Sequence, residues 1–558
     1  MLSNKRDLLT ILILCSVFFS LAVWNLGMTK TPITAWQARE DRSFYADLGG
    51  VENVNRVYFL VKLGSADVTV YTGSPNSWMY NGALEIPRSL TFTYYRWNDY
   101  RVNMETQYLR FNFHDASIEI AEMAILDSNN QKLTFDVIST EGTDTNLSKL
   151  VDEQDVVECP PTYMSEAHFD ELYFVRTAEN YLHLQSPYSW SHPPLGKLII
   201  ASGILVFGYS PFGWRIVGVI FATLLIPLIY VMGKKLFGTW IGAFASAFLL
   251  TFDFMNFSMG RMATVDVYVA FFSLASQLSF LIYIKGVLKD GWKTSITPLF
   301  FAVLFFALGF STKWIVLFGF LGQLAILLGF RLKEVINQKE TLSVKIKRIF
   351  DYPFFILLIF ILLAVCIYFI TYIPNMLAGQ SLDDIFNLQW SIFRYHSSLI
   401  SSHPYASRWY TWPFSLKPVL LFRTYLPNNM MSIIVAMGNP AVCWVGFSFV
   451  LLSVERAIRK KFSSIFIVVI FFFQWLPYAL ISRTTFLYHF YSDVPFLCLA
   501  TAYFLNKYWS NKWTKIATIA YFSIVIILFG LFYPITSGMP TSISWLDNLK
   551  WLETWTFY

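Results

Sequence analysis

The sequence DELYFVRTAENYLHLQSPYSWSHPPLGK, residues 170–197, decides the class of fold. It opens on acids, continues through aromatic residues, and reaches Pro193 and Pro194 before an apolar segment begins at Gly196 and Lys197. Proline fixes φ and lacks an N–H donor, and a cation beside aromatic residues is typical of a membrane boundary. The stretch therefore predicts an active site at a membrane surface, with an interfacial anchor as the alternative.

The composition around this stretch places the chain in a membrane. Of 558 residues, 55% are hydrophobic, 19% are aromatic and only 14% are charged, which is more apolar surface than a soluble core buries. Apolar runs long enough to cross a bilayer predict about eleven transmembrane helices. They begin near Leu8, Phe212, Trp240, Val265, Leu299, Trp314, Phe354, Ala441, Ser464, Val494 and Ile516.

Lys and Arg collect in alternate loops, which predicts the orientation. Basic clusters follow at 234–235, 285–293, 331–348, 456–461 and 507–515, so these loops are expected in the cytoplasm together with the N-terminus. Residues 28–190, residues 375–440 and the C-terminal tail then lie outside. The net charge of +6 is explained by this bias and gives no reason to expect nucleic acid as a partner. The first apolar run lacks a small-residue cleavage site and is expected to remain as a helix.

Between the first helix and Asp170 the sequence changes character. Alternating runs at 57–61, 67–71, 107–113 and 118–120, with turn signals at 73–76 and 129–130, predict a β-sandwich. The run 118–133 resembles an edge of discoidin-like, carbohydrate-binding sandwiches. Five aromatic residues of this region have two possible roles: they stack on a sugar or a partner protein, or they belong to the core of the domain. They are Trp78, Tyr80, Tyr94, Tyr95 and Trp97. The predicted domains are 1–28 (first helix), 29–160 (sandwich and linker) and 161–558 (catalytic region, with outer loops at 161–211 and 375–440).

Polar residues at the outer ends of the spans are the next signal, because charge at membrane depth is costly and usually functional. They occur in four places: Asp253 with Arg261 and Asp266, then Lys313, then the loop from His403 to Pro413, then Arg483 to His489. Interfacial anchoring explains any one of these places but explains the set poorly. The five cysteines are scattered and offer no disulfide framework, and no metal-site spacing is present, so no zinc site is expected.

These motifs together resemble the protein O-mannosyltransferase family, glycosyltransferase family 39. The matching elements are Asp170-Glu171, His192-Pro193-Pro194-Leu195-Gly196-Lys197, Arg261 with Asp266, Lys313-Trp314, the loop His403-Pro404-Tyr405 to Trp409 and Trp412-Pro413, Gly438-Asn439-Pro440, and Phe486-Leu487-Tyr488-His489 with Tyr491. They stand in family order between about residues 165 and 535. The resemblance implies a multi-helix GT-C membrane fold and a polyprenyl or dolichyl phosphomannose donor. It also implies inverting transfer to Ser or Thr hydroxyls of translocated proteins, on the outer face of the cell membrane.

The sequence departs from this family in three ways. The loop 375–440 is too short for the MIR domain of eukaryotic members, so the chain resembles the prokaryotic type. Trp190 stands where the family often has an Asp two places before the His of the His-Pro-Pro motif. The inserted sandwich is unlike the short first loop of the best-known members, which leaves acceptor choice open.

The residues suggest roles in a single inverting displacement. Asp170 is expected to be the catalytic base. Neighbouring helical residues point about 100° apart, so Glu171 cannot face the same target and is assigned to positioning or hydrogen bonding. Arg261, Lys313, Arg408 and Arg483 are candidates for the donor phosphate, since guanidinium and ammonium groups bind phosphate well. The other candidates for the donor site are Asp266, His403, Trp409, Tyr488 and His489, and His192, Pro193, Pro194 and Lys197 form the loop motif.

Other functions stay open at this point. A sibling enzyme would move arabinose, glucose or a hexosamine to a lipid or glycan. A transporter would need inverted repeats and broken helices at the midplane, whereas the polar residues here gather on one face. A lectin-like receptor would leave the polar ends of the other helices unexplained. The expected partners are membrane lipids, the lipid-linked sugar, protein acceptors and the translocation machinery.

Overall fold

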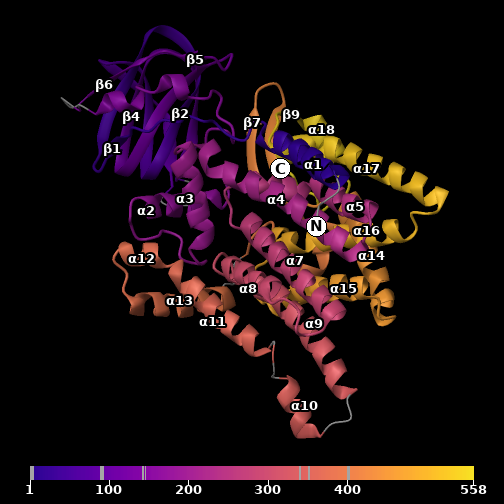
Figure 1. Ribbon diagram of the computed structural model, residues 1–558. Coiled ribbons are helices and arrows are strands. Elements are labelled where there is room, and N and C mark those ends of the chain that lie inside the picture. Colours follow the sequence, from indigo (N-terminus) through magenta and orange to yellow (C-terminus); the bar gives the residue numbers. More distant parts are fainter. Residues whose placement is uncertain are drawn as a thin grey trace.

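The computed structural model describes residues 5–87, 93–140, 144, 146–337, 341–349, 352, 354–398 and 402–558. Within them the chain forms a body of packed helices and a separate sheet domain, which lies at the upper left of Figure 1 in indigo and purple. The sheet domain follows the first helix directly in sequence. The body and the domain each have a hydrophobic core of their own.

Eight helices of the described chain are long and apolar enough to cross a membrane, or nine if a bent pair counts as one span. The eight are α1 (Lys5–Val23), α4 (Pro211–Phe237), α7 (Asp266–Asp290), α9 (Val316–Ile336), α11 (Phe354–Ile370) continued by α12 (Ile373–Leu377), α14 (Pro440–Ile458), α15 (Phe462–Trp475) continued by η4 (Leu476–Leu480), and α17 (Lys512–Ser537). The polytopic helical membrane fold predicted from the sequence is confirmed.

Fewer helices pass this test of length and apolarity than the about eleven spans predicted from the sequence. Every predicted span coincides with a helix, but α5 (Trp240–Thr251) and α6 (Phe254–Gly260) form one pair bent by 54°. Two more, α8 (Thr297–Phe310) and α16 (Val494–Lys507), have 14 residues each, fewer than the roughly 20 that an untilted crossing needs. Most residues of α5 and α16 are buried among other helices, and an apolar sequence does not distinguish such burial from contact with lipid.

Asp253 causes the break between α5 and α6. Its Oδ1 accepts hydrogen bonds of 3.0 Å from the backbone N–H groups of Met255 and Asn256, so it caps α6. Its Oδ2 accepts a bond of 3.2 Å from the backbone N–H of Asn439. The buried Asp253 carboxylate therefore stabilises the start of α6 directly after the end of α5, and it links this bend to the start of α14.

The two sets of loops gather at opposite ends of the helices. At one end Ser463 Oγ donates to Leu236 O (2.9 Å), and the Arg331 guanidinium lies over the Trp292 ring. At the other end, Met28 N donates to Met164 O (2.8 Å) and Trp555 Nε1 donates to Ser415 O (2.9 Å). Each of these four contacts joins two segments that the charge pattern predicts on the same side of the membrane.

The sheet domain is one antiparallel sheet of six strands: β1 (Trp36–Ala38), β2 (Arg42–Ser74), β3 (Ser77–Ile86), β4 (Arg96–Asp127), β5 (Lys132–Leu133) and β6 (Asp136–Ser139). The long strands β2 and β4 pair twice, so that Tyr58 lies opposite both Asp99 and Ala124. The sheet thus folds back on itself around a buried core that includes Trp36 and Phe44. Alternation within the strands correctly predicted a sheet domain. The strands β2 and β4 are continuous, so they form one folded sheet and not two separate ones.

Shorter elements form the rim on the side of the sheet domain and the C-terminus. They are α2 (Glu171–Leu182), α3 (Leu195–Phe207), α13 (Leu382–Ser398), η3 (Trp409–Phe414), η5 (Leu487–Asp493) and a small sheet of β7 (Val419–Leu426), β8 (Met430–Ala436) and β9 (Thr541–Ser542), followed by α18 (Ile543–Asn548). The linker holds η1 (Leu147–Leu150) and η2 (Gln154–Val156), and α10 (Leu342–Ile349) projects from the far end (Figure 1).

Candidate active site

Two cavities adjoin on the rim side of the helical body. The first, here called the Asp170 cavity, has a volume of about 710 Å³ and lies among the start of α2, the loop 188–192, the end of α13 and the segment 483–488. The second, the Lys313 cavity, has a volume of about 420 Å³ and lies among residues 313–318, Phe393 and residues 478–483. Both cavities are lined by His192, His396 and Arg483, so these three side chains form their shared wall.

Asp170 lies at the start of α2 and lines the cavity named after it. Its carboxylate does not cap the helix and has no hydrogen-bond partner in the described part of the chain. The preceding residue, Phe169, has φ of +52°, a left-handed conformation that is strained for a bulky side chain and turns the chain into the helix. The carboxylate is therefore held at the cavity without being neutralised by a local partner.

The surroundings of Asp170 favour its protonated form. The side chain is only half-buried by surface area, but the surface that it exposes faces the cavity and not open solvent. Loss of hydration, followed by the nearby carboxylate of Asp266, raises the pKa of Asp170 to about 7, against an opposing effect of Lys313. A carboxylate with a pKa near neutrality is suited to accept a proton and release it again.

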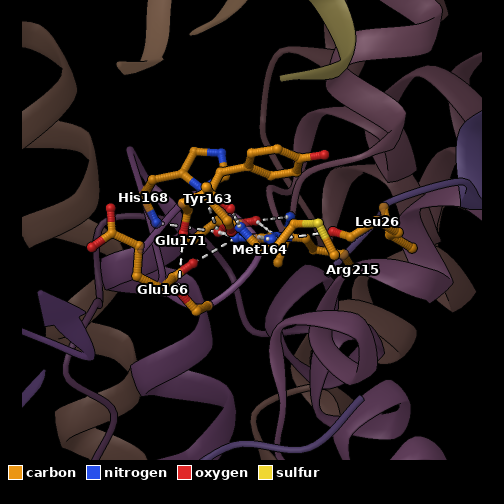
Figure 2. Close-up of polar contacts among 10 residues, drawn as sticks. Leu26, Tyr163, Met164, Glu166, His168, Glu171 and Arg215 are labelled. Carbon is orange, nitrogen blue, oxygen red and sulfur yellow. Dashed lines mark hydrogen bonds and ion pairs between the residues drawn. The ribbon is translucent and has the colours of Figure 1, made fainter. Parts of the chain in front are cut away.

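Glu171 is the centre of a buried network (Figure 2). Arg215, on α4, donates to it twice, from Nε to Oε1 (2.8 Å) and from an Nη to Oε2 (2.7 Å). Oε1 also accepts from the backbone N–H of Ala263 (2.9 Å), and Oε2 accepts from that of His168 (3.2 Å). Burial alone would raise the pKa of Glu171, but Arg215 and His168 bring it below its ordinary value. Both oxygens are fully engaged, so Glu171 positions the loop and does not face the cavity.

Arg215 extends the same network to the first helix. Its Nη groups donate to the carbonyl oxygens of Leu26 (3.1 Å), Tyr163 (2.8 Å) and Glu166 (2.7 Å), as Figure 2 shows. Neither Arg215 nor Glu171 is exposed to solvent. The pair thereby fixes residues 163–171, which carry Asp170, against α1 and α4. Arg215 was not among the residues predicted from the sequence, although a lone Arg inside an apolar span is a signal of a functional charge.

Lys313 forms a buried ion pair beside the same site. Its Nζ lies 2.8 Å from Asp266 Oδ1, at the start of α7, and 5.7 Å from the centre of the Tyr488 ring. Lys313 lines the cavity named after it, and Tyr488 lines the Asp170 cavity. Asp266 lines neither cavity and acts through Lys313 and Asp170.

Arg483 links two histidines on the shared wall. One Nη donates to His396 Nδ1, and the other donates to His489 Nε2 at 3.3 Å. Burial, with Arg483 adding to it, lowers the pKa of His396 to about 4, so its ring is neutral and Nε2–H donates to Ser191 O (2.7 Å). His192 stacks on His396 with ring centres 4.9 Å apart. His396 was not predicted as a site residue, because it lies at the end of a helix far from the motifs.

Several predicted site residues lie elsewhere, and their assignments are corrected. Arg261 lines neither cavity, because its Nη groups donate to the carbonyl oxygens of Ala22, Trp24, Asn25 and Ser537 at 2.7–3.0 Å. Arg408 is exposed at the start of η3 and also lies outside both linings. The phosphate roles predicted for these two arginines do not fit this placement.

The remaining motif residues mostly build the walls. Lys197 is buried and donates from Nζ to Ser189 O (2.8 Å) and His192 O (2.6 Å), which fixes the loop after Pro193 and Pro194. Trp409 packs edge-on against Trp475 and lines neither cavity. His403 does line the Asp170 cavity, and so does Trp190, which lies edge-on to Tyr395. The position where the family often has Asp thus presents an aromatic ring to the cavity.

One group of possible metal ligands exists among the described residues, and it lies away from the cavities. Oxygen atoms of Glu122, Asp152 and Glu153 lie within 4.8 Å of one another beside the linker. They already accept hydrogen bonds from Gln154, Ile33 and Thr34. The group is therefore part of the packing of the linker on the sheet domain.

The rim of this polytopic helical body thus holds an acid of near-neutral pKa next to a cavity with cations and apolar walls. Family models match residues 191–372, described as dolichyl-phosphate-mannose-protein mannosyltransferase, and residues 381–555, described as the C-terminal four-transmembrane region of protein O-mannosyltransferase. Together they cover more than half of the chain. The chain belongs to the protein O-mannosyltransferase family.

Curated relatives and a solved structure agree with this membership. A polyprenol-phosphate-mannose–protein mannosyltransferase of Mycolicibacterium smegmatis is 24% identical in an alignment of length 463 that covers 71% of this chain and 89% of the relative. The enzyme of the same name from Corynebacterium glutamicum is 23% identical in an alignment of length 427 that covers 65% of this chain and 81% of the relative. The Saccharomyces cerevisiae Pmt1–Pmt2 complex bound to the sugar donor shares the fold, with a TM-score of 0.59, 14% identity and coverage of 70% of this chain and 89% of that one.

Proposed function

We propose that this protein transfers a mannosyl group from a polyprenyl phosphate to the hydroxyl of Ser or Thr in protein acceptors, with inversion at the sugar. The observation that carries the proposal is Asp170, an unpartnered carboxylate among the described residues, with its pKa raised to about 7 at a cavity that adjoins a second, cationic one. The names of the mycobacterial and corynebacterial relatives support the donor and the acceptor class.

The Lys313 cavity suits a lipid phosphate. Lys313 and Arg483 supply positive charge, and a phosphate binds well to an ammonium and a guanidinium group together. The rest of the lining is mainly apolar and fits a polyprenyl chain: Trp314, Ile315, Leu317, Phe318, Phe393, Leu480 and Ile481. We assign the donor to this cavity, with its sugar directed across the shared wall toward Asp170.

The chemistry is a single displacement. The acceptor oxygen bonds to C1 of the mannosyl group as the bond from C1 to the phosphate oxygen breaks, and the electron pair of that bond leaves with the phosphate. Asp170 takes the hydroxyl proton, and the products are a mannosylated protein and polyprenyl phosphate. Lys313 and Arg483 stabilise the charge that grows on the departing phosphate, so no general acid is required. Tyr488 and His489 shape the wall between the two reactants.

We further propose that the active site faces the extracytoplasmic side of the cell membrane. The basic loops lie at the opposite end of the helices, and positive charge is retained in the cytoplasm. The N-terminus is then cytoplasmic and residues 538–558 lie outside. An acceptor would meet the site as it emerges from translocation, which makes the translocation machinery a partner.

The test is reconstitution of the purified protein in liposomes with radiolabelled polyprenyl phosphomannose and a Ser/Thr-rich peptide. We expect label on the peptide and release of polyprenyl phosphate in equal amount. A parallel reaction with the corresponding arabinose and glucose donors measures sugar selectivity. Transfer from one of those donors and not from the mannose donor would replace this proposal with the sibling function.

The pH dependence of transfer should follow the ionisation of Asp170. Only the deprotonated carboxylate accepts a proton, and the pKa of this group is raised to about 7. The kcat/KM for the acceptor should therefore fall about tenfold for each pH unit below 7 and level off above it. Initial rates between pH 5 and 9 check this, and a midpoint near 4 would show that the carboxylate titrates as an ordinary Asp.

Arg483→Gln should impair the use of the donor. The change removes a charge-assisted contact to the phosphate, so kcat/KM for the donor should fall about ten- to a hundredfold, while the KM of the acceptor changes little. Arg408→Gln is the matched control, since Arg408 is exposed and outside both linings. Equal losses in the two variants would remove Arg483 from the donor site.

A further inference from the structure

The sheet domain is clamped onto the loop that carries Asp170. Residues 93–97, which lead into β4, make backbone contacts just before Asp170: Ala167 N donates to Tyr95 O (3.0 Å), and Trp97 N donates to Glu166 Oε2 (3.0 Å). The same segment also holds α2 just after Asp170, because Tyr94 OH donates to Glu179 Oε2 (2.7 Å). The inserted domain therefore contacts the chain on both sides of the proposed base.

Aromatic packing fixes this clamp on the helical body. Tyr95 is fully buried, lies edge-on to Tyr209 and Trp214 and donates from its hydroxyl to Pro32 O (3.1 Å). Tyr94 is 3% exposed and its hydroxyl lies 2.6 Å from that of Tyr209. These two tyrosines belong to the interface between the domain and the body. The sequence alone had allowed either a sugar-binding role or a core role for them. The segment is consequently held in one place relative to Asp170.

Arg96 lies between these fixed residues and lines the Asp170 cavity. Its backbone lies opposite Val61, at the start of the pairing of β4 with β2, so the strand fixes the position of the Arg96 Cα atom. Its positive charge acts on Glu166 and on His168, in the loop before Asp170. Arg483, the other arginine of the lining, contacts His396 and His489 and is shared with the Lys313 cavity. The two cations therefore belong to different parts of the cavity.

We infer that Arg96 is a specificity residue, through which the sheet domain selects acceptors that carry a carboxylate beside the reacting Ser or Thr. The inference rests on the proposed function, because it concerns the acceptor of that reaction. Arg483 is taken by the donor side, so Arg96 is the cation of the lining that an acceptor meets. A guanidinium group has five N–H donors in a planar fork and binds a carboxylate with two parallel hydrogen bonds, even while it serves another acceptor. The remaining walls near Asp170 are largely aromatic and suit the uncharged parts of a peptide.

The experiment is a charge exchange between enzyme and peptide in the reconstituted full-length protein. Three peptides differ only in the residue next to one Thr, which is Asp, Asn or Lys, and kcat/KM is measured for each with polyprenyl phosphomannose. The wild type should prefer the Asp peptide to the Lys peptide by about tenfold or more, Arg96→Gln should abolish the preference, and Arg96→Glu should reverse it. The KM of the donor should stay unchanged in both variants.

Arg101→Glu is the matched control, because Arg101 is exposed on the same strand, outside the cavity lining, and should keep the wild-type preference. Arg96→Gln is the decisive variant if Arg96→Glu fails to fold, and thermal melting of each purified variant identifies that case. Equal use of the three peptides by the wild type, or an unchanged preference in Arg96→Gln, would overturn the inference. Failure of all peptides with the wild type would instead count against the proposed function.

Discussion

Asp170→Asn should lower peptide mannosylation at least about a hundredfold, the usual contribution of a general base, and this is the largest kinetic effect we expect. Asn keeps the shape of the side chain but cannot accept the hydroxyl proton. Binding of the lipid donor should be retained, because the phosphate contacts assigned to Lys313 and Arg483 are unchanged. Single-turnover transfer and equilibrium donor binding, measured on the same preparation, separate these two effects.

Stability provides the control for this variant. The fold raises the pKa of Asp170 from 3.8 to about 7, so it disfavours the charged form, and this group costs stability as the pH rises from about 4 to 7. Asn carries no charge, and Asp170→Asn should therefore melt no lower than the wild type at pH 8. Asp383→Asn, an exposed change on α13, should leave transfer unaffected. Near-normal turnover in Asp170→Asn would remove Asp170 from the mechanism.

Arg215→Met should give the largest loss of stability. It leaves the Glu171 carboxylate buried and charged without its main partner, and breaking a buried ion pair in this way costs about 3–5 kcal/mol. The carbonyl groups of Leu26, Tyr163 and Glu166 lose their donors in the same step. Chemical unfolding of the protein in detergent, followed by the decrease in helix signal or by protease resistance, measures the change.

A double variant shows whether the effect belongs to the pair. Glu171→Gln alone should also destabilise the protein, and Glu171→Gln with Arg215→Met should cost less than the two single losses added together. Additive losses would mean that the two side chains act independently. If Glu171→Gln instead melted like the wild type but lost transfer, Glu171 would act on the reactants and not on the position of the loop.

The sequence predicted the residues whose charge is unusual for their position. Lys313 and Arg483 stand out because Lys and Arg collect mainly at the cytoplasmic ends of apolar spans, whereas these two lie at predicted outer ends, and both line a cavity in the structure. Asp170 was predicted because it stands next to Glu171, at the start of the stretch that leads to the His192-Pro193-Pro194 motif. Alternation of apolar residues likewise predicted the strands of the sheet domain, since one face of each is buried in its core.

The same reasoning failed for Arg261, for a physical reason. Helices end with carbonyl groups that lack partners, and Arg261 binds those at the ends of α1 and α17. Burying a cation costs free energy in this structural role as it does in phosphate binding. A lone Arg in an apolar stretch of sequence is therefore compatible with either role. Only the positions of α1 and α17 distinguish them.

His396 and Arg96 were beyond prediction because they reach the site through long-range packing. His396 comes from a helix on the rim, more than 200 residues after Ser191, to which it donates. Arg96 comes from the inserted domain, and nothing in the alternation of its strand indicates that the strand begins at a cavity of the helical body. Residues of this kind follow from tertiary contacts and not from local pattern.

The pairing of β9 with β8 is the first of a chain of contacts that leads from the segment after α17 to the wall of the site. Thr541 lies opposite Met431, and Trp555 donates to the carbonyl of Ser415, whose own N–H donates to Trp412 O. Trp412 in turn stacks against His489 on the wall of the site. Residues 541–557 thus reach the site without lining either cavity: they hold Ser415, which holds Trp412, which packs on His489. The shape of the wall at His489 therefore depends on a segment that touches neither reactant.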